Sequence, residues 1–464
     1  MKVLLTKPII EESKRVHTVP PLSLAYLATA LRKNNEVSIL DCEHLRYTKN
    51  DFSRHINHAR PELIGITVFS HNKGMVKKNI SVIRKTLPDT VIVLGGPHIN
   101  ARGVNVFHEF PGIDYAIRGE AEMSMALLVD AISCNRNESF ADIPGLIYRN
   151  VTGSIQEVAN VFAEDISQFD PIPYDLLDIQ SYFGGVPQGF FCRQKELASI
   201  ITSRGCPYPC TFCAASVNSG KKVRYRKCEH VIEEIGLLTH RYGVREIHIL
   251  DDNFTFSKEY AHTLCEEIIR HGFNIDLALP NGIRLDKIDE ELLAVMRRAG
   301  FYSISFGIES GSDETLRRIK KLETTDFIRN RISLAKKHGF RVTGTFIIGF
   351  PWETKHDVEV TLRFAKSLPL DHAAFGNFTP LPATEITDDL IKSGELQEDY
   401  EVPYTWGNIT YSPPGIKGDE LKRLQRQCVF KFYFPRRMLL IISNIRWSNI
   451  MQMLRRFLLL FKNT

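Results

Sequence analysis

The stretch that most constrains this chain is 203–216, which reads SRGCPYPCTFCAAS. Its three cysteines, Cys206, Cys210 and Cys213, stand at C-x₃-C-x₂-C spacing within eight residues. The two prolines between the first two cysteines exclude a helix, so the segment is predicted to be a loop. A loop can turn three thiolates towards one centre, and thiolates select zinc or iron–sulfur clusters.

The remaining cysteines do not complete a four-thiolate zinc site, because the next one, Cys228, stands alone. Three ligands where four are expected leave one metal position open, which favours a reactive centre over a structural one. A structural site with His230 as the fourth ligand, or a chance cluster of cysteines, is the alternative interpretation.

The cysteine run resembles the motif of the radical S-adenosylmethionine (SAM) superfamily. In that family three cysteines hold a 4Fe–4S cluster whose open iron binds the amino and carboxylate groups of SAM, and reduction releases a 5′-deoxyadenosyl radical. The resemblance implies Cys206, Cys210 and Cys213 as the metal ligands, and it places Phe212 near the adenine. The cofactors supply this chemistry, and the protein supplies placement and shielding.

The bulk composition indicates a soluble protein of two or three domains, with 464 residues, 43% apolar and 24% charged. A formal net charge of +5 gives no case for nucleic acid as a partner. Nine cysteines, three of them clustered, fit a reducing compartment. The N-terminus meets charge too early for a secretory signal, and no apolar run reaches the ~18–20 residues of a membrane span, so a cytoplasmic location is expected.

Residues 1–150 alternate between apolar strands and helical patterns, which predicts a doubly wound, Rossmann-like parallel sheet covered on both faces. The expected strands are Val3–Thr6, Glu36–Leu40, Leu63–Thr67, Val91–Leu94 and Tyr115–Ile117. The expected helices are Leu22–Arg32, Lys73–Thr86 and Ala121–Ile132. Ligands of such sheets bind beyond the carboxyl ends of the strands.

The loops at those ends carry small and hydroxyl residues, as a large planar ligand pressed onto backbone requires. As a set, PPLSLAYLATAL, TVFSHN, LGGPHIN and IDYAIRGEAE resemble the cobalamin-binding domain that precedes many radical SAM enzymes. The resemblance implies cobalamin contacts at Ser23, Thr67, Ser70, Gly95, Gly96, His98, Gly119 and Glu120.

One departure concerns the D-x-H-x-x-G motif that supplies an axial histidine in other cobalamin proteins. It is absent here, since His17 has neither the aspartate nor the glycine. We therefore expect no histidine ligand by that route, and we interpret His98 as a structural or corrin-edge residue. A domain that keeps the fold but has lost cobalamin is the alternative.

Residues 151–195, rich in Asp, Pro and aromatics, are predicted to form a linker packed across two domains. Residues 196–385 contain six strand–helix units, which predict a partial (β/α)₆ barrel with its active site at the carboxyl ends of the strands. Their expected strands are Leu197–Thr202, Glu246–Leu250, Asp276–Leu279, Ser303–Phe306, Arg341–Ile348 and Ala373–Phe378.

Polar clusters fall at those strand ends, and GIESGSDETL and GFPWET closely match the cobalamin-dependent branch of the family. The resemblance implies that Asp251-Asp252-Asn253 contact the methionine ammonium of SAM. Arg284 and Glu309-Ser310 match positions near the carboxylate and ribose. Ile347 and Gly349 lie on the strand whose backbone reads the adenine edge.

Residues 386–464 read as an irregular stretch followed by a mainly helical region. Tyr404, Trp406 and Tyr411 are candidate substrate contacts. Residues 436–464 carry an amphipathic pattern, which predicts either a helix packed on the protein or one lying on a membrane. The second alternative would suit a lipid-like substrate.

The resemblance implies a cobalamin-dependent radical SAM enzyme that methylates an unactivated carbon of a small molecule or lipid-like substrate, with flavodoxin or ferredoxin as electron donor. One alternative is oxidation or cyclisation without methyl transfer, as in enzymes resembling the anaerobic magnesium-protoporphyrin monomethyl ester cyclase. Another is a non-catalytic cobalamin or redox sensor. A methylthiotransferase is disfavoured, because Cys42, Cys134 and Cys192 are scattered and lack the context of its further cluster cysteines.

Overall fold

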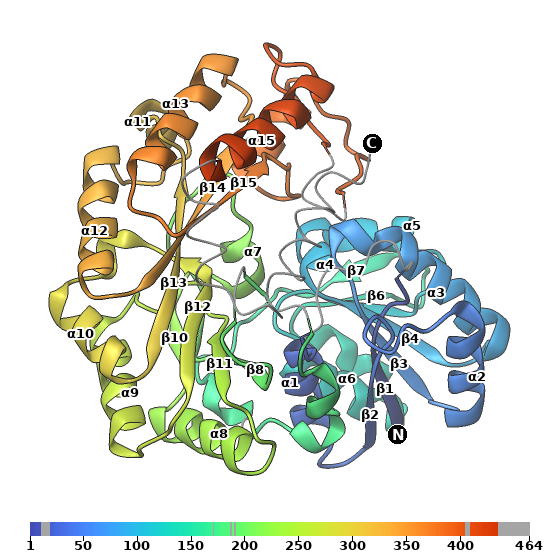
Figure 1. Cartoon of the computed structure of the whole chain (residues 1–464). Helices are drawn as coiled ribbons and strands as arrows, with labels where there is room; N and C mark the ends of the chain where they lie inside the picture. The colour runs from blue at the N-terminus through green and yellow to red at the C-terminus, as the bar shows by residue number, and fades with distance from the viewer. Residues whose placement is uncertain (11–18, 170, 186–187, 190–191, 404–408, 435–464) are drawn as a thin grey trace.

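Two separate sheets organise the protein, which a computed structural model describes over residues 1–10, 19–169, 171–185, 188–189, 192–403 and 409–434. The sheets lie side by side, with the short helix α7 (Ala215–Ser219) in the space between them (Figure 1). The α/β class predicted from the sequence is confirmed, with a doubly wound first domain, a six-stranded partial barrel and a helical C-terminal region.

The first sheet has seven strands in the order β2-β1-β3-β4-β5-β6-β7. The strands are β1 (Lys2–Lys7), β2 (Glu36–Asp41), β3 (Leu63–Thr67), β4 (Val91–Gly95), β5 (Tyr115–Ile117), β6 (Leu146–Arg149) and β7 (Ile155–Glu157). β1 to β5 are parallel, as predicted. Each face of the sheet packs its own apolar core.

Helices cover both faces of this sheet, as the near-continuous apolar strands require. On one face α1 (Leu22–Leu31) packs against α6 (Glu122–Ser133), and on the other α2 (Lys49–Ala59) packs against α3 (Lys73–Thr86). Short helices α4 (Pro97–Arg102) and α5 (Val106–Glu109) follow β4. The sequence did not predict α2, whose eleven residues bury only Phe52 and Ile56.

The sheet also extends beyond the predicted boundary at residue 150. β6 pairs antiparallel with β5, and β7 pairs antiparallel with β6, so the first sheet ends at Glu157. With four and three residues, β6 and β7 are too short to show an alternating pattern in the sequence.

The second sheet has six parallel strands in the order β15-β14-β13-β12-β11-β8. The strands are β8 (Leu197–Ile200), β11 (Glu246–Ile249), β12 (Asp276–Ile283), β13 (Phe301–Glu309), β14 (Arg341–Ile348) and β15 (His372–Asn377). The helices between them are α8 (Cys228–His240), α9 (Lys258–Arg270), α10 (Glu290–Arg298), α11 (Asp313–Arg318), α12 (Thr325–Lys337) and α13 (Lys355–Ser367). Side chains of Ser257, Asp289 and Thr324 cap α9, α10 and α12 and so fix where these helices begin.

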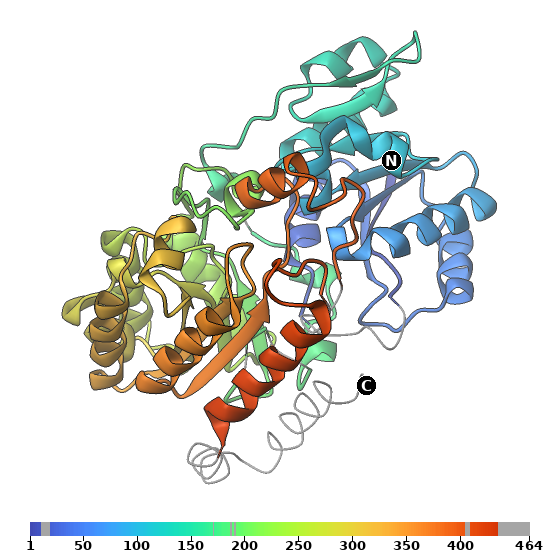
Figure 2. The same ribbon diagram turned by 90° about the horizontal axis from the view of Figure 1, so that it is seen from above.

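The open edge at β15 is covered by α15 (Gly418–Tyr433), which lies along that strand (Figure 2). The Tyr433 hydroxyl is 3.1 Å from both the backbone nitrogen and the backbone oxygen of Ala373. Gln425 Nε2 donates to the Phe375 carbonyl at 2.8 Å. These side chains form hydrogen bonds with backbone groups of β15 that would otherwise be exposed at the edge of the sheet.

The segment between the sheets is built from three short 3₁₀ turns, Ile166–Phe169, Tyr174–Leu176 and Ile179–Tyr182. The Tyr182 hydroxyl donates to Asp41 at the end of β2, at 3.1 Å, and the Tyr174 hydroxyl donates to Glu234 of α8. The segment therefore contacts both domains.

The C-terminal region contains α14 (Glu385–Lys392) and α15. The candidate substrate contacts Tyr404 and Trp406 and the amphipathic segment 436–464 lie outside the described residues. Within the described part of the chain, no helix has both the length and the apolar character that crossing a bilayer demands.

Candidate functional site

The cysteine loop leaves the short strand β9 (Ser203–Arg204) and returns through α7 to β10 (Arg224–Tyr225), which pairs with it antiparallel. Gly205 at the start of the loop has φ +105°, and a Cβ there would lie 2.3 Å from the Lys222 carbonyl oxygen. Only glycine fits this position. The Cys206 amide donates to the Gly220 carbonyl at 3.0 Å, which closes the base of the loop.

Asp251, at the end of β11, anchors the turn that leads into this loop. Its carboxylate accepts hydrogen bonds from the Thr202 amide, the Thr202 hydroxyl and the Ser203 hydroxyl, each at 2.6 Å. Burial raises the pKa of Asp251 to about 6 despite these donors. Both oxygens are engaged with the loop, so the geometry favours a structural task for Asp251 over the predicted contact with SAM.

The next two predicted residues differ from one another. Asp252 accepts from the Gly205 amide at 3.3 Å and so also supports the cysteine loop. Asn253 is 2% exposed, and its Nδ2 has no hydrogen-bond partner among the described residues. A buried donor without a partner costs free energy unless something outside the chain accepts from it. Asn253 is therefore the member of this cluster that is left for a ligand.

The three loop cysteines face one region. Burial raises the pKa values of Cys206 and Cys210, and these two thiols are themselves among the neighbouring charges that raise the pKa of Cys213. Cys228 begins α8, and its pKa is raised by burial and by the charges of Glu229 and Glu267. The thiols of Cys206, Cys210 and Cys213 therefore interact electrostatically, and Cys228 is not part of this group.

The thiol is the kind of side chain that holds an iron–sulfur cluster. Among the described residues, no three His, Cys, Asp or Glu side chains gather closely enough to hold one metal ion. The donor set of three thiols on a loop fits the cluster that the sequence predicts.

Four buried charges lie beside the cysteines, at the carboxyl ends of β12 and β13. Lys321 Nζ is 3.3 Å from Glu309 Oε1, and Arg284 is 3.7 Å from Glu323. Arg284 also donates to the Lys321 carbonyl at 2.6 Å. Within the part of the chain that the structure describes, Arg284 Nη1 and Glu323 Oε2 have no hydrogen-bond partner. These four residues therefore offer one donor and one acceptor to a ligand that carries both a negative and a positive charge.

The predicted adenine side lies at the end of β14. The Phe212 and Phe350 rings meet edge to face with centroids 5.9 Å apart. Glu353 Oε2 accepts from the Gly349 amide at 2.7 Å and from the Phe350 amide at 3.2 Å, and burial raises the pKa of Glu353 to about 7. These bonds fix the backbone of the GFPWET turn.

The other two predicted residues near the SAM site are placed differently. Ile347 is half-buried on β14, paired with Gly376 of β15. The Ser310 hydroxyl is 3.2 Å from the Thr361 hydroxyl of α13 and accepts from the Ser312 amide, also at 3.2 Å. It is engaged with the protein and fully buried, which fits support of the loop after β13.

The predicted cobalamin loops meet at the carboxyl edge of the first sheet. Gly96 has φ +103°, and a Cβ there would lie 2.9 Å from Thr67 Oγ1 and 3.0 Å from the Val68 carbonyl. Thr67 at the end of β3 and Gly95-Gly96 at the end of β4 are thus brought together, whereas Ser23 is exposed on α1.

His98 lies behind these loops with both ring nitrogens engaged. Nδ1 is 3.0 Å from the Ser70 hydroxyl, and Nε2 is 2.8 Å from Glu109. The side chain is 3% exposed. This geometry favours the structural role expected for His98 and leaves neither nitrogen free to bind a metal.

The loop after β5 joins the first sheet to the cysteine loop. The Gly119 amide donates to Asn100 Oδ1 at 2.7 Å, and Asn100 Nδ2 donates to Asn218 of α7 at 3.2 Å. Glu120 accepts hydrogen bonds from both terminal nitrogens of Arg224. The Glu120 carboxylate is therefore committed to the domain boundary.

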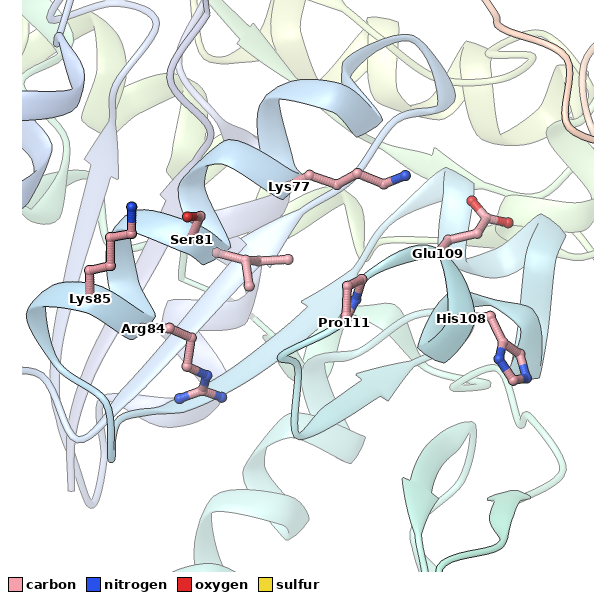
Figure 3. Close-up of a pocket in the computed structure, with 8 residues that line it drawn as sticks. Lys77, Ser81, Arg84, Lys85, His108, Glu109 and Pro111 are labelled. Carbon is pink, nitrogen blue, oxygen red and sulfur yellow. The ribbon is translucent and has the colours of Figure 1, made fainter.

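A pocket of about 650 Å³ lies elsewhere, between α3 and the α5 turn (Figure 3). It is lined by Lys77, Ile80, Ser81, Arg84, Lys85, His108, Glu109 and Pro111. Arg84 is already bonded to the Gly112 and Thr90 carbonyls and to Asp114. None of the predicted site residues lines this pocket, and we assign it no part in the site.

Four residues of the site were missed in the sequence: Lys321, Glu323, Glu353 and Asn100. Lys321 stands in a charged run, RRIKKLE, that reads as a solvated helix end. Glu353 and Asn100 lie inside the quoted segments GFPWET and LGGPHIN, but their spacing gives no sign of which side chain turns inward.

Two family models match the chain. Residues 200–365 match the radical SAM superfamily, and residues 13–129 match the B12 binding domain. Together they cover the cysteine loop, most of the barrel and most of the first domain.

Three curated relatives align over most of the chain. An uncharacterised methyltransferase, PH0819, from Pyrococcus horikoshii is 34% identical over 95% of this chain and 94% of its own length. Cytidylyl-2-hydroxyethylphosphonate methyltransferase from Streptomyces wedmorensis is 27% identical over 91% of this chain and 88% of its own. The anaerobic magnesium-protoporphyrin IX monomethyl ester cyclase of Rubrivivax gelatinosus is 26% identical over 87% of this chain and 71% of its own.

Among solved structures, the fold is similar to that of the radical SAM methyltransferase TsrM from Kitasatospora setae, solved with cobalamin and a [4Fe-4S] cluster bound. The TM-score is 0.72 at 20% identity, over 93% of this chain and 88% of that one. At this identity the likeness concerns the fold alone.

Proposed function

Because this chain belongs to the radical SAM superfamily, in the branch that carries a B12-binding domain, we propose that it methylates an unactivated carbon of a small-molecule substrate. The chain is an enzyme of the cobalamin-dependent, methyltransferase-like kind, and its cofactors are a 4Fe–4S cluster, SAM and cobalamin. When bound, the cluster and SAM supply a 5′-deoxyadenosyl radical, and cobalamin supplies the methyl group.

The observation that carries the proposal is the bridge made by Asn100. It joins the loop after β5, on the predicted cobalamin edge, to Asn218 on the helix that follows the cysteines. A substrate that must meet both a radical and a methyl donor needs the two sites held face to face, because misplacement by about 1 Å can cost 10²-fold in rate.

Within the barrel, we assign the binding of SAM to polar groups that have no partner in the described ranges of the chain. Arg284 Nη1 would hold the carboxylate, and Glu323 Oε2 would accept from the ammonium. Asn253 Nδ2 is a further buried donor for the same ligand. Phe212 and the Gly349 backbone would then border the adenine, as the sequence predicts.

Radical oxidation or cyclisation is the second candidate function. It is supported by the similarity to the Rubrivivax cyclase over 87% of this chain. SAM carrying a labelled methyl group separates the two candidates once a substrate turns over. Methyl transfer puts the label into the product, and cyclisation does not.

The first test of the proposed function needs no substrate. Cys206→Ala, Cys210→Ala and Cys213→Ala should each reduce reductive cleavage of SAM to background, whereas Cys228→Ala should retain it. The assay is 5′-deoxyadenosine formation by the reconstituted enzyme under anaerobic conditions. Cleavage that survives in a loop variant, or is lost in Cys228→Ala, contradicts the ligand assignment.

Two partners belong to the proposal. A flavodoxin or ferredoxin would supply the electron, since radical SAM chemistry begins with a one-electron reduction. Membrane contact through 436–464 remains a hypothesis; deletion of this segment should abolish pelleting with vesicles of anionic lipid, and unchanged pelleting would overturn it.

A further inference from the structure

Lys321 is buried where a lysine rarely lies, on the inner side of the barrel next to the cysteine loop. It is 5% exposed, whereas the following residue, Leu322, is 71% exposed. Burying an ammonium costs several kcal/mol unless charge partners and hydrogen bonds compensate. Burying Lys321 while exposing Leu322 does not stabilise the fold, so this arrangement requires another explanation.

The backbone is bent to achieve this inversion. Lys320 and Leu322, on either side of Lys321, both have positive φ angles, +54° and +58°. Glu309, the ion partner of Lys321, has φ +67°. Left-handed backbone is unfavourable for a non-glycine residue, and such strain gathers at functional sites. Three of the strained residues of the chain therefore frame one ion pair.

The pair rests directly on the strand β13. A Cβ built on Gly307 would lie 2.5 Å from Glu309 Oε1 and 3.1 Å from Lys321 Nζ. The missing side chain leaves the space that the ammonium and carboxylate fill. Gly307 has an ordinary φ, so the need for glycine here is steric and concerns this pair alone.

The charge of Lys321 reaches the cysteines. The segment that carries Lys321 contacts the cysteine loop directly, because the amide of Thr211, the residue after Cys210, donates a hydrogen bond to the Ile319 carbonyl at 3.1 Å. A fixed cation near thiolate ligands also stabilises the electron-rich, reduced form of an iron–sulfur cluster.

We propose that Lys321 is a positioning residue of the cluster site, whose buried ammonium, held over Gly307 by Glu309, raises the reduction potential of the cluster. The inference rests on the proposed function, because it needs the cluster on the three cysteines. It assigns to the chain a charged residue that acts on the cluster without binding it.

The test compares cluster potentials in the reconstituted full-length chain without SAM or substrate. Lys321→Met removes the charge at similar length, and Lys321→Arg keeps it. Lys320→Met is the matched control, since Lys320 is exposed and paired with Glu385 at 2.6 Å. The readouts are the midpoint potential, from a redox titration followed by electron paramagnetic resonance, and the iron content of each variant.

We expect Lys321→Met to shift the midpoint to more negative potential, with Lys321→Arg and Lys320→Met close to the wild type. Glu309→Gln should shift it in the opposite direction, because it leaves the ammonium uncompensated. If Lys321→Met binds as much iron as the wild type and its midpoint potential is unchanged, the inference is overturned. If Lys321→Met loses its iron, the midpoint potential of Glu309→Gln decides. A shift to more positive potential supports the inference, and an unchanged or more negative potential overturns it. A wild type that forms no cluster would overturn the proposed function as well.

Discussion

The carboxylate of Glu120 accepts two hydrogen bonds from the guanidinium of Arg224, at 2.6 and 2.8 Å, across the boundary between the two domains. Beside it, Glu122 is 2.8 Å from Arg204, the residue directly before the cysteine loop. All four side chains are at most 12% exposed. Strand β10 is thus bonded to the loop that follows β5, and strand β9 to the first residue of α6. These contacts fix the cysteine loop against the first domain.

Breaking these ties should loosen the domain boundary. We expect the double variant Glu120→Gln/Glu122→Gln to lower the thermal midpoint of the chain, since removing one partner of a buried ion pair costs roughly 3–5 kcal/mol. Glu164→Gln is the control, because its pair with Lys222 is 3.0 Å long but 71% and 86% exposed. Equal midpoints for the double variant and the control would contradict the structural role of the buried pairs.

Asp251 should be needed for the cysteine loop to form. In Asp251→Asn, the amide replaces an acceptor oxygen, so one donor of Thr202 or Ser203 loses its partner at a cost of roughly 1–3 kcal/mol. We expect less iron per chain after anaerobic reconstitution. Asp252→Asn should lose less, because the Asp252 carboxylate interacts only with the Gly205 amide, at 3.3 Å, and with the side chain of Ser219 among its hydrogen-bonding neighbours in the described residues. The reverse order of iron contents would show that Asp252 is the anchor.

Glu353 should make the stability of the chain depend on pH. Burial raises its pKa from 4.5 to about 7, so the folded chain holds a proton that the unfolded chain releases between these values. Stability from this group is therefore present below about pH 4.5 and lost as the pH rises through 7, by roughly 3 kcal/mol. Thermal midpoints of wild type and Glu353→Gln, measured without cofactors, should diverge from pH 5 to pH 7.5, with the wild type falling faster. If the thermal midpoints of the two proteins change in parallel with pH, the raised pKa of Glu353 is refuted.

Gly96 should be required for cobalamin but not for the cluster. Gly96→Ala forces a Cβ to within 2.9 Å of Thr67 Oγ1 at a φ of +103°. We expect the cobalt content of the reconstituted chain to fall while its iron content stays at the wild-type level. Gly74→Ala in α3 is the matched control, with no heavy atom within 4 Å of the added Cβ. Full cobalt occupancy in Gly96→Ala would place cobalamin elsewhere.

The sequence predicts the architecture well because long apolar strands alternate with helices throughout both sheets. The range Lys73–Thr86 is the same in the prediction and the structure, and most other elements differ by a few residues at their ends. The failures are the polar helix Lys49–Ala59 and the short strands Leu146–Arg149 and Ile155–Glu157, whose periodicity is too weak to read.

The candidate site was predictable only where residue type and strand ends coincide. The cysteines, Arg284 and Gly96 belong to such segments. The inward turn of Lys321 depends on the left-handed backbone at Lys320 and Leu322, which no local pattern encodes. Glu120 is a residue for which the strand-end rule misleads. It follows a strand among cobalamin-like segments, but its carboxylate pairs with Arg224, which comes more than a hundred residues later in the chain. Pairing across domains is a tertiary property that spacing along the chain does not reveal.

The most direct test of the account is an anaerobic ultraviolet–visible spectrum of the protein purified from cobalamin-fed cells, with iron and cobalt assayed on the same sample. We predict cluster and cobalamin bands together, with about four iron atoms and one cobalt per chain. A cluster without cobalt would contradict the two-cofactor enzyme and would exclude methyl transfer through cobalamin.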